Sequence, residues 1–249
     1  MHLNLSEIDQ SKLPFGGRIA NFLGNWEKIT SDNTILSHVK GLKIDFQEVP
    51  FQGVNAGQMN LSEKEKAALN QEIKEMIEKK AVEIVDQKSL KMNDQFLSTL
   101  FVRPKKDGGL RPIFNLKALN RFVAYKHFKM EGFQVVKSTL KQNDFLCKID
   151  LKDAYFCVPI DQSQRKFLRF IWEGETLQYR SLPFGLACGP LIFTKIMKPL
   201  VAILRRIGVR LVIYLDDILL LNQSREGLIR DRDSLIYLLH NLGWVINQS

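Results

Sequence analysis

The sequence has little of what marks a secreted or membrane protein. Its three cysteines, Cys147, Cys157 and Cys188, are odd in number and form no CxxC pair, so neither a disulfide framework nor a zinc knuckle is predicted. The longest apolar runs flank Asp216 and Asp217 and are far shorter than the roughly 20 residues that a membrane-spanning helix needs. The start, MHLNLSEIDQ, shows no signal-peptide pattern. We therefore expect an intracellular chain, in cytoplasm or nucleus, with no membrane partner.

The composition is that of a globular protein with a basic surface. The 249 residues are 45% hydrophobic and 25% charged, which gives room for one large domain or two small ones around a core. The net charge is +9, and residues 101–137 concentrate nine basic side chains against two acidic ones, interleaved with aromatic rings. Such a segment is typical of a surface that follows phosphates. A solvated basic face of another kind of protein has the same pattern, so both interpretations stay open.

Helices are predicted at three places along the chain. Ser62 and Glu65 form a capping box at the start of the first. Its buried face is expected to carry Leu69, Ile73, Met76, Ile77 and Ile84. A second helix is predicted from Pro190 towards Arg206, and a third over residues 224–242, each followed by a glycine that ends it.

Strands are predicted between these helices. Turn residues indicate one hairpin over residues 97–116, around Asp107-Gly108-Gly109, and a second over 167–182. Residues 145–151 read as a strand that ends at an aspartate. Residues 209–221 form two apolar strands joined through a pair of aspartates. The chain therefore mixes helices with antiparallel hairpins.

Asp216 and Asp217 are adjacent acids between two apolar strands. Their charges repel, and burial of the flanking strands increases the cost of keeping both ionised. A bound cation would remove that cost. Paired aspartates also occur in ordinary turns, where water solvates them, but such a turn does not need a fully apolar strand on each side.

Asp150 ends the strand over residues 145–151, a position that a strand end or a helix cap would also explain. If this strand lies beside the 209–221 hairpin, Asp150 faces Asp216 and Asp217. Three hard oxygen ligands without a nearby His or Cys suit Mg²⁺ rather than zinc. Such a set is typical of a two-metal site for nucleotidyl transfer. We predict two Mg²⁺ ions, with Mn²⁺ as a substitute.

Four segments, in this order, resemble motifs of reverse transcriptases. They are FVRPKKDGGLRPIFNLKALNR (101–121), KIDLKDAYFCVPI (148–160), SLPFGLACGPLIF (181–193) and YLDD (214–217). The resemblance covers about residues 62–249. Five short segments are most similar in sequence to the reverse transcriptases of DIRS-type retrotransposons: NLKALNRFV, KHFKMEG, KIDLKDAYF, RKFLRF and VIYLDDILL. The segment GGRIANFLGNWEKIT also resembles the region ahead of the polymerase in those elements.

The resemblance implies a role for each matching residue. Asp150 and Asp216 would bridge the metal ions, Asp217 would complete the site, and the carbonyl of Leu151 would reach the nucleotide-bound ion. The other residues would surround the incoming dNTP: Lys105 and Arg111 at the triphosphate, Asp153 and Ala154 beneath triphosphate and sugar, Tyr155 as a gate against a ribose 2′-hydroxyl, and Phe184 and Gly185 along the pocket. Many retroviral enzymes have Gln in place of Phe184, so apolar stacking is expected there. A ring packed in the core is the alternative for Tyr155.

The resemblance implies an α+β, right-hand polymerase fold. Residues 1–60 would be an N-terminal extension of unclear structure, with Phe22 and Trp26 as anchors. Residues 61–249 would be fingers and palm, with an antiparallel palm sheet backed by helices, ending before the thumb. The expected activity is RNA-directed DNA polymerisation: dNTP addition to a primer 3′-hydroxyl on an RNA or DNA template.

Two alternatives to this activity stay open. One is a catalytically incompetent, nucleic-acid-binding remnant of a mobile element. The other is a palm-type polymerase that copies RNA into RNA. Tyr155 disfavours the second, because a ribonucleotide polymerase needs room for the 2′-hydroxyl.

Overall fold

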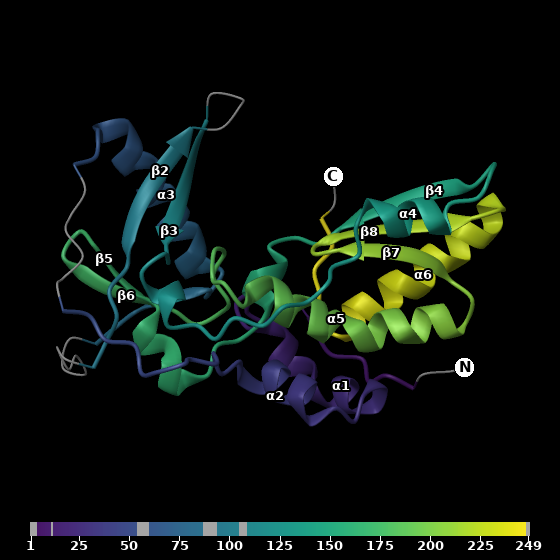
Figure 1. Ribbon diagram of the computed structural model, residues 1–249, viewed down its shortest axis with the longest axis horizontal. Helices are drawn as coiled ribbons and strands as arrows, with labels where there is room; N and C mark the ends of the chain where they lie inside the picture. Colours follow the sequence, from purple (N-terminus) through teal and green to yellow (C-terminus); the bar gives the residue numbers. More distant parts are fainter. Residues whose placement is uncertain (1–3, 11, 54–59, 87–93, 105–108, 248–249) are drawn as a thin grey trace.

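Among the residues that the structure describes, three antiparallel sheets form the framework. The computed structural model describes residues 4–10, 12–53, 60–86, 94–104 and 109–247. In Figure 1 two of the sheets lie with α3 (Glu63–Glu78) in the left-hand lobe. The third lies with α5 (Gly189–Arg206) and α6 (Arg225–Asn241) in the right-hand lobe. The N-terminal helices α1 (Leu23–Ile29) and α2 (Asn33–Gly41) run beneath the junction of the lobes. Within these residues, no helix is both long enough and apolar enough to cross a membrane.

The right-hand lobe is built on a three-stranded sheet in the order β4-β8-β7. Its strands are β4 (Phe145–Asp150), β8 (Asp217–Asn222) and β7 (Arg210–Tyr214). Helix α6 (Arg225–Asn241) contacts β8 and β4, and α5 (Gly189–Arg206) contacts β7. The strands predicted over 145–151 and 209–221 are therefore confirmed, and they pair with each other.

Strand alternation decides which residues this sheet buries. Ile149 of β4 pairs with Ile218 of β8, which also pairs with Ile213 of β7. Ile149 and Ile218 are buried, and Ile213 packs against the same core. One position further along, Lys148 and Leu219 point to the opposite face, because successive side chains alternate. That second face also carries Asp150 and Asp217, which brings charge to one end of the sheet.

The left-hand lobe holds the two predicted hairpins. Strands β2 (Thr99–Pro104) and β3 (Leu110–Asn115) pair from Thr99–Asn115 to Pro104–Leu110, and residues 105–108 between them lie outside the described residues. Strands β5 (Arg169–Trp172) and β6 (Glu175–Tyr179) are joined by Glu173 and Gly174, both with positive φ. Strand β1 (Val82–Ile84) adds to the free edge of β6.

Helix α3 (Glu63–Glu78) begins at the predicted capping box. Ser62 and Glu65 exchange both hydrogen bonds, and Leu69, Ile73 and Met76 are buried as expected. The assignment of Ile84 to this buried face was wrong. The helix ends at Glu78, Lys80 takes a positive φ of 55°, and Ile84 lies on β1 with 57% of its surface exposed. The turn breaks the helical period before Ile84 is reached.

Residues near the N-terminus form helices that pack under α5. They are the 3₁₀ helix η1 (Arg18–Phe22), α1 (Leu23–Ile29) and α2 (Asn33–Gly41). Helices α1 and α2 both contact α5. Phe22 and Trp26 are fully buried, which confirms them as anchors. The other short elements are η3 (Leu119–Arg121), α4 (Phe133–Thr139), η4 (Ala154–Cys157) and η5 (Gln162–Phe167).

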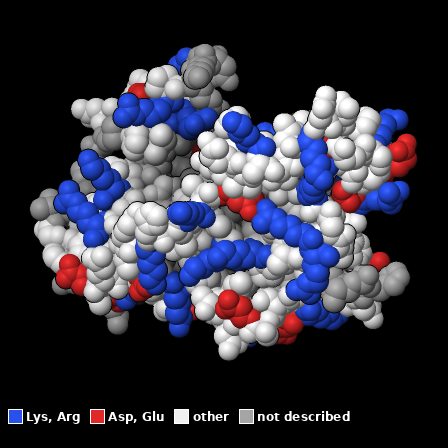
Figure 2. Space-filling view, turned by 45° about the vertical axis from the view of Figure 1, so that its right-hand side comes forward, with Lys and Arg blue, Asp and Glu red and all other residues white. Residues whose placement is uncertain are grey.

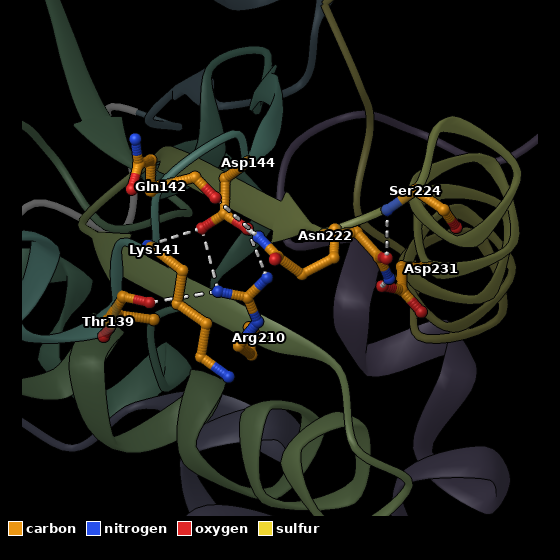
Figure 3. A network of polar contacts seen from close by, with 9 residues as sticks. Thr139, Lys141, Gln142, Asp144, Arg210, Asn222, Ser224 and Asp231 are labelled. Carbon is orange, nitrogen blue, oxygen red and sulfur yellow. Dashed lines mark hydrogen bonds and ion pairs between the residues drawn. The ribbon is translucent and has the colours of Figure 1, made fainter.

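A polar network closes the end of the β4-β8-β7 sheet that lies away from Asp150 (Figure 3). The Arg210 guanidinium donates to the carboxylate of Asp144 at 2.8 Å and to the carbonyl of Thr139 at 3.1 Å. Asp144 also accepts from the backbone N–H of Lys141 at 2.8 Å. This network joins the start of β7 to the turn before β4, so it holds the ends of the sheet together.

Candidate active site

Three acids meet where β4 ends and the β7–β8 hairpin turns. Asp150 is the Cα partner of Asp217 across β4 and β8. Asp216 occupies the turn with Leu215, which takes a positive φ of 53°. The N–H of Leu151 donates to the carbonyl of Asp216 at 3.0 Å, so the turn is tied directly to the end of β4. The condition set by the sequence, that the two segments lie side by side, is therefore met.

Two of these carboxylates have side-chain partners that the sequence reasoning missed. The Lys148 ammonium lies 2.9 Å from Oδ1 of Asp217. The Asn247 amide donates to Oδ2 of Asp150 at 3.0 Å, and its backbone N–H donates to the Asp150 carbonyl at 2.8 Å. Lys148 lies two residues before Asp150, on the same face of β4, so strand alternation could have identified it. Asn247 carries no comparable signal, because its approach depends on the path of the chain after α6.

The acids influence one another electrostatically. Burial raises the pKa of Asp216, and the carboxylates of Asp217 and Asp150 raise it further. The contact with Asp217 raises the pKa of Lys148. The negative charge at the end of the sheet is thus shared among three groups and offset in part by one lysine.

The three carboxylates are ligands that suit a hard divalent cation, although their side chains do not point to one common position in this structure. Among the described residues, no group of three or more His, Cys, Asp and Glu side chains is arranged to hold a metal ion. Two of the carboxylates point to the partners named above, Lys148 and Asn247. Burial, and after it the neighbouring acids, raise the pKa of Asp216, and a bound cation would act in the opposite direction by favouring its charged form. Asp150, Asp216 and Asp217 provide carboxylate oxygens only, the ligands that Mg²⁺ prefers.

A cavity of about 690 Å³ opens beside these acids. Asp216 lines it, together with three other residues predicted for the site, Arg111, Phe184 and Gly185. Arg111 comes from β3 and Gly185, with a φ of 91°, from the turn before α5. The rest of the lining is mostly apolar, apart from Glu72, and comes from α3, β2, β3, η4 and β6. The cavity therefore joins the two lobes, and it combines two acids, Glu72 and Asp216, and one base, Arg111, with apolar walls. Lys105 lies outside the described residues.

Asp153 and Ala154 follow the end of β4 in a tight turn. Asp153 takes a positive φ of 43°, and its carboxylate lies 2.8 Å from the ammonium of Lys79 at the end of α3. Ala154 begins η4 and is buried. The Asp153 side chain thus faces α3, so its backbone and that of Ala154 are the groups left to approach a ligand.

Tyr155 sits inside a cluster of aromatic rings. Its ring stacks on Phe193 with centroids 5.4 Å apart and planes 5° apart, and it lies 4.9 Å from the ring of Phe184. It is only 6% exposed, and burial raises its pKa. The ring is therefore packed among aromatic side chains. It also adjoins Phe184, which is 50% exposed and lines the cavity.

Basic side chains gather on the surface of the molecule. Figure 2 shows Lys and Arg in bands across one face, with fewer Asp and Glu between them. The net charge of +9 agrees with this distribution. Such a surface attracts a polyanion over a range set by the salt concentration.

The fold is similar to part of a foamy virus protein of known structure. The structure of Prototype Foamy Virus Protease-Reverse Transcriptase superposes with a TM-score of 0.65 and 17% sequence identity, over 82% of this chain and 26% of that chain. A selenomethionine-labelled CSH mutant of the same protein gives a TM-score of 0.66 and 16% identity, with the same coverage. At this identity the similarity establishes the fold alone, a mixed helix-and-strand fold that resembles this part of the foamy virus chain.

The sequence itself identifies the family. The family described as reverse transcriptase (RNA-dependent DNA polymerase) matches residues 103–249, more than half of the chain. The chain therefore belongs to the reverse transcriptase family, as its motifs indicated. The Tf2-3 and Tf2-4 polyproteins of Schizosaccharomyces pombe transposons are each 25% identical to it over 146 residues, and the Tf2-7 polyprotein is 24% identical. The match covers 59% of this chain and 11% of each of these curated relatives, so the chain spans a small part of their length.

Proposed function

We propose that the chain is the RNA-directed DNA polymerase domain of a retrotransposon, of the DIRS type. It would add dNTPs to a primer 3′-hydroxyl on an RNA or DNA template. The observation that carries the proposal is the pairing of Asp150 with Asp217 beside Asp216, at a cavity that Arg111 also lines. Family membership and the transposon polyproteins among the relatives support the same activity.

In this proposal the two lobes correspond to the fingers and the palm of a polymerase. The β2–β3 hairpin and α3 act as fingers, and the β4-β8-β7 sheet with α5 and α6 acts as the palm. Residues 61–249 then contain both, and the helices before residue 60 support the palm from below. The contacts of α1 and α2 with α5 favour this supporting role.

Asp150, Asp216 and Asp217 would hold the metal ions, with the Leu151 carbonyl as a further ligand. Two bound Mg²⁺ ions supply electrostatic stabilisation of the attacking and leaving oxygens in nucleotidyl transfer. Without metal ions, Lys148 pairs with Asp217 and Asn247 donates to Asp150. These two contacts would hold the carboxylates in place at the strand ends, where acids without partners would repel one another.

The remaining residues would bind and orient the nucleotide. Arg111, with Lys105 in the same hairpin, would contact the triphosphate, because a guanidinium donates two parallel hydrogen bonds to phosphate oxygens. Phe184 and Gly185 would line the pocket around the base and sugar. The backbone of residues 153–154 would lie beneath the triphosphate and sugar. The Tyr155 ring would limit the space at the sugar 2′ position. Catalysis would come from positioning rather than from covalent chemistry of the protein.

Primer extension with matched variants tests the proposal. We expect Asp150→Asn and Asp216→Asn to abolish dNTP addition in Mg²⁺, while binding of primer-template survives. Asp233→Asn is the control, because this acid lies on α6, is 59% exposed and pairs with the adjacent Arg232. Near-normal extension by either active-site variant would reject the assignment. Tight binding with no extension by the unsubstituted chain would support the non-catalytic remnant, and preferential use of rNTPs would support an RNA-copying polymerase.

A further inference from the structure

Gly189 lies where a side chain has no room. It is the first residue of α5, it is buried, and its φ is outside the left-handed region, so its backbone conformation is open to any residue. A Cβ built on it would lie 2.8 Å from Cε1 of Tyr155 and 3.6 Å from Cδ1. Real Cβ atoms essentially never approach within 3.0 Å of a heavy atom from a residue elsewhere in the chain. The Tyr155 ring therefore occupies the space that a side chain at residue 189 would fill.

Two aromatic neighbours determine how the ring could respond. Phe193 stacks on Tyr155 and is fully buried, so it cannot give way without disturbing the core. Phe184 lies on the ring as well, but it is 50% exposed and lines the cavity. Of the two neighbouring rings, Phe184 is therefore the one that can yield, and it yields on the side of the cavity that it lines.

We propose that Gly189 is a positioning residue that sets how far the Tyr155 ring extends towards the nucleotide sugar. The inference rests on the proposed function and deepens it. Phe193 fixes the plane of the ring, and the missing side chain of Gly189 lets the ring edge withdraw against α5. The tyrosine thus leaves room for a deoxyribose while it still closes the space of a 2′-hydroxyl.

Single-nucleotide insertion kinetics give the first test. We expect Gly189→Ala to raise KM for dNTP by about 10-fold, the range expected for one extra methyl group in a tight pocket, with kcat little changed. Insertion of rNTP should fall further, so the ratio of rNTP to dNTP insertion decreases. Gly24→Ala in α1 is the control, because a Cβ there has no neighbour within 4 Å. An equal loss for both nucleotides would mean a merely structural role and would overturn the proposal.

A double-mutant cycle separates the contact from other effects of the substitution. In a Tyr155→Leu background the ring edge that meets the new Cβ is gone. Gly189→Ala should then leave the ratio of rNTP to dNTP insertion unchanged. A decrease of the same size in both backgrounds would show that Gly189 acts on something other than Tyr155.

A binding measurement makes the test independent of turnover. The chain has five tyrosines, so 3-fluorotyrosine labelling gives a few ¹⁹F resonances, and Tyr155→Phe identifies that of Tyr155. On a primer ended by a dideoxynucleotide, dNTP with Mg²⁺ should shift this resonance in the unsubstituted chain. Gly189→Ala should move the resonance before nucleotide is added and should weaken apparent dNTP binding, whereas Gly24→Ala should do neither. A Tyr155 resonance that responds neither to Gly189→Ala nor to dNTP would overturn the inference.

The two measurements distinguish this inference from the proposed function. Nucleotide binding that depends on Gly189, without any extension by the unsubstituted chain, would reject the polymerase activity and keep the positioning role. Extension with an unchanged rNTP to dNTP ratio in Gly189→Ala would keep the activity and reject the positioning role.

Discussion

Trp26 and Trp244 meet edge to face in the core, with ring centroids 6.4 Å apart and planes 77° apart. Both rings are fully buried. Trp26 also donates its indole N–H to the carbonyl of Leu242 at 3.0 Å. Trp244 in turn packs edge to face on Phe193, which stacks on Tyr155. A continuous line of aromatic rings therefore links the N-terminal helices to the candidate nucleotide pocket.

The first prediction concerns this link. We expect Trp26→Ala to lower the free energy of unfolding by about 3–5 kcal/mol, because it empties a buried site and leaves the Leu242 carbonyl without its partner. Trp172→Ala is the control, since Trp172 is only partly buried and its N–H donates to Asn70 at an exposed position. Urea unfolding of the two variants measures the difference. Equal losses would mean that residues before 60 contribute little to the core.

The second prediction concerns the Asp144–Arg210 ion pair (Figure 3). The hydrogen bonds from Arg210 hold the pKa of Asp144 well below its usual value of 3.8. Because the folded pKa is the lower one, the pair stabilises the protein fully above about pH 5, and the contribution is lost as the pH falls below about 4. Asp144→Asn should therefore be less stable than the unsubstituted chain at pH 7, and the gap should narrow in acid.

Unfolding midpoints at pH 7, 5 and 3 measure this gap. Asp233→Asn serves as the control, because its carboxylate is exposed and pairs only with the adjacent Arg232 among the contacts described here. A gap that stays constant from pH 7 to pH 3 would contradict the assignment of the pH dependence to Asp144.

Local patterns were enough to predict the elements that build the site. The Ser62–Glu65 capping box marks α3, and the apolar runs on both sides of Asp216 and Asp217 predict the β7–β8 hairpin. The pairing of Asp150 with Asp217 followed from placing two apolar strands side by side. These features depend on residues close in sequence, or on a single choice of strand neighbour.

The contacts that could not be predicted join distant parts of the chain. Nothing near Trp26 indicates that its N–H meets Leu242, or that Asn25 donates to Asn241. Asn247 reaches Asp150 only after α6 has crossed the sheet. Gly189 looks like an ordinary helix start, and its importance appears only when the Tyr155 ring is seen against it. In each case tertiary packing, rather than local preference, sets the role.

The third prediction separates nucleotide binding from template binding in the β2–β3 hairpin. We expect Arg111→Ala to raise the apparent Kd for dNTP by about 10-fold or more, because a charge-assisted bidentate contact is lost, with a smaller effect on primer-template affinity. Lys105→Ala should behave in the same way. Arg103→Ala is the control: Arg103 pairs with Arg111 across the hairpin, but it lies over the ring of Phe101 and not among the cavity residues.

Equilibrium binding of labelled primer-template and of dNTP, measured separately at one salt concentration, gives both affinities. A larger loss for primer-template than for dNTP in Arg111→Ala would make the hairpin a general grip on nucleic acid. Equal effects of Arg111→Ala and Arg103→Ala would show that only the charge of the hairpin matters.

The fourth prediction concerns sugar selection by Tyr155. Replacing it with Val should let rNTPs compete better, raising the ratio of rNTP to dNTP insertion by a factor on the order of 10 or more, because the ring no longer fills the 2′ space. The substitution also empties part of the core around Phe193, so the stability of each variant must be measured as well. Tyr155→Phe is the control: it keeps the ring, and its ratio should stay unchanged. If Tyr155→Val lowers stability and leaves the ratio as it was, Tyr155 is a core residue alone.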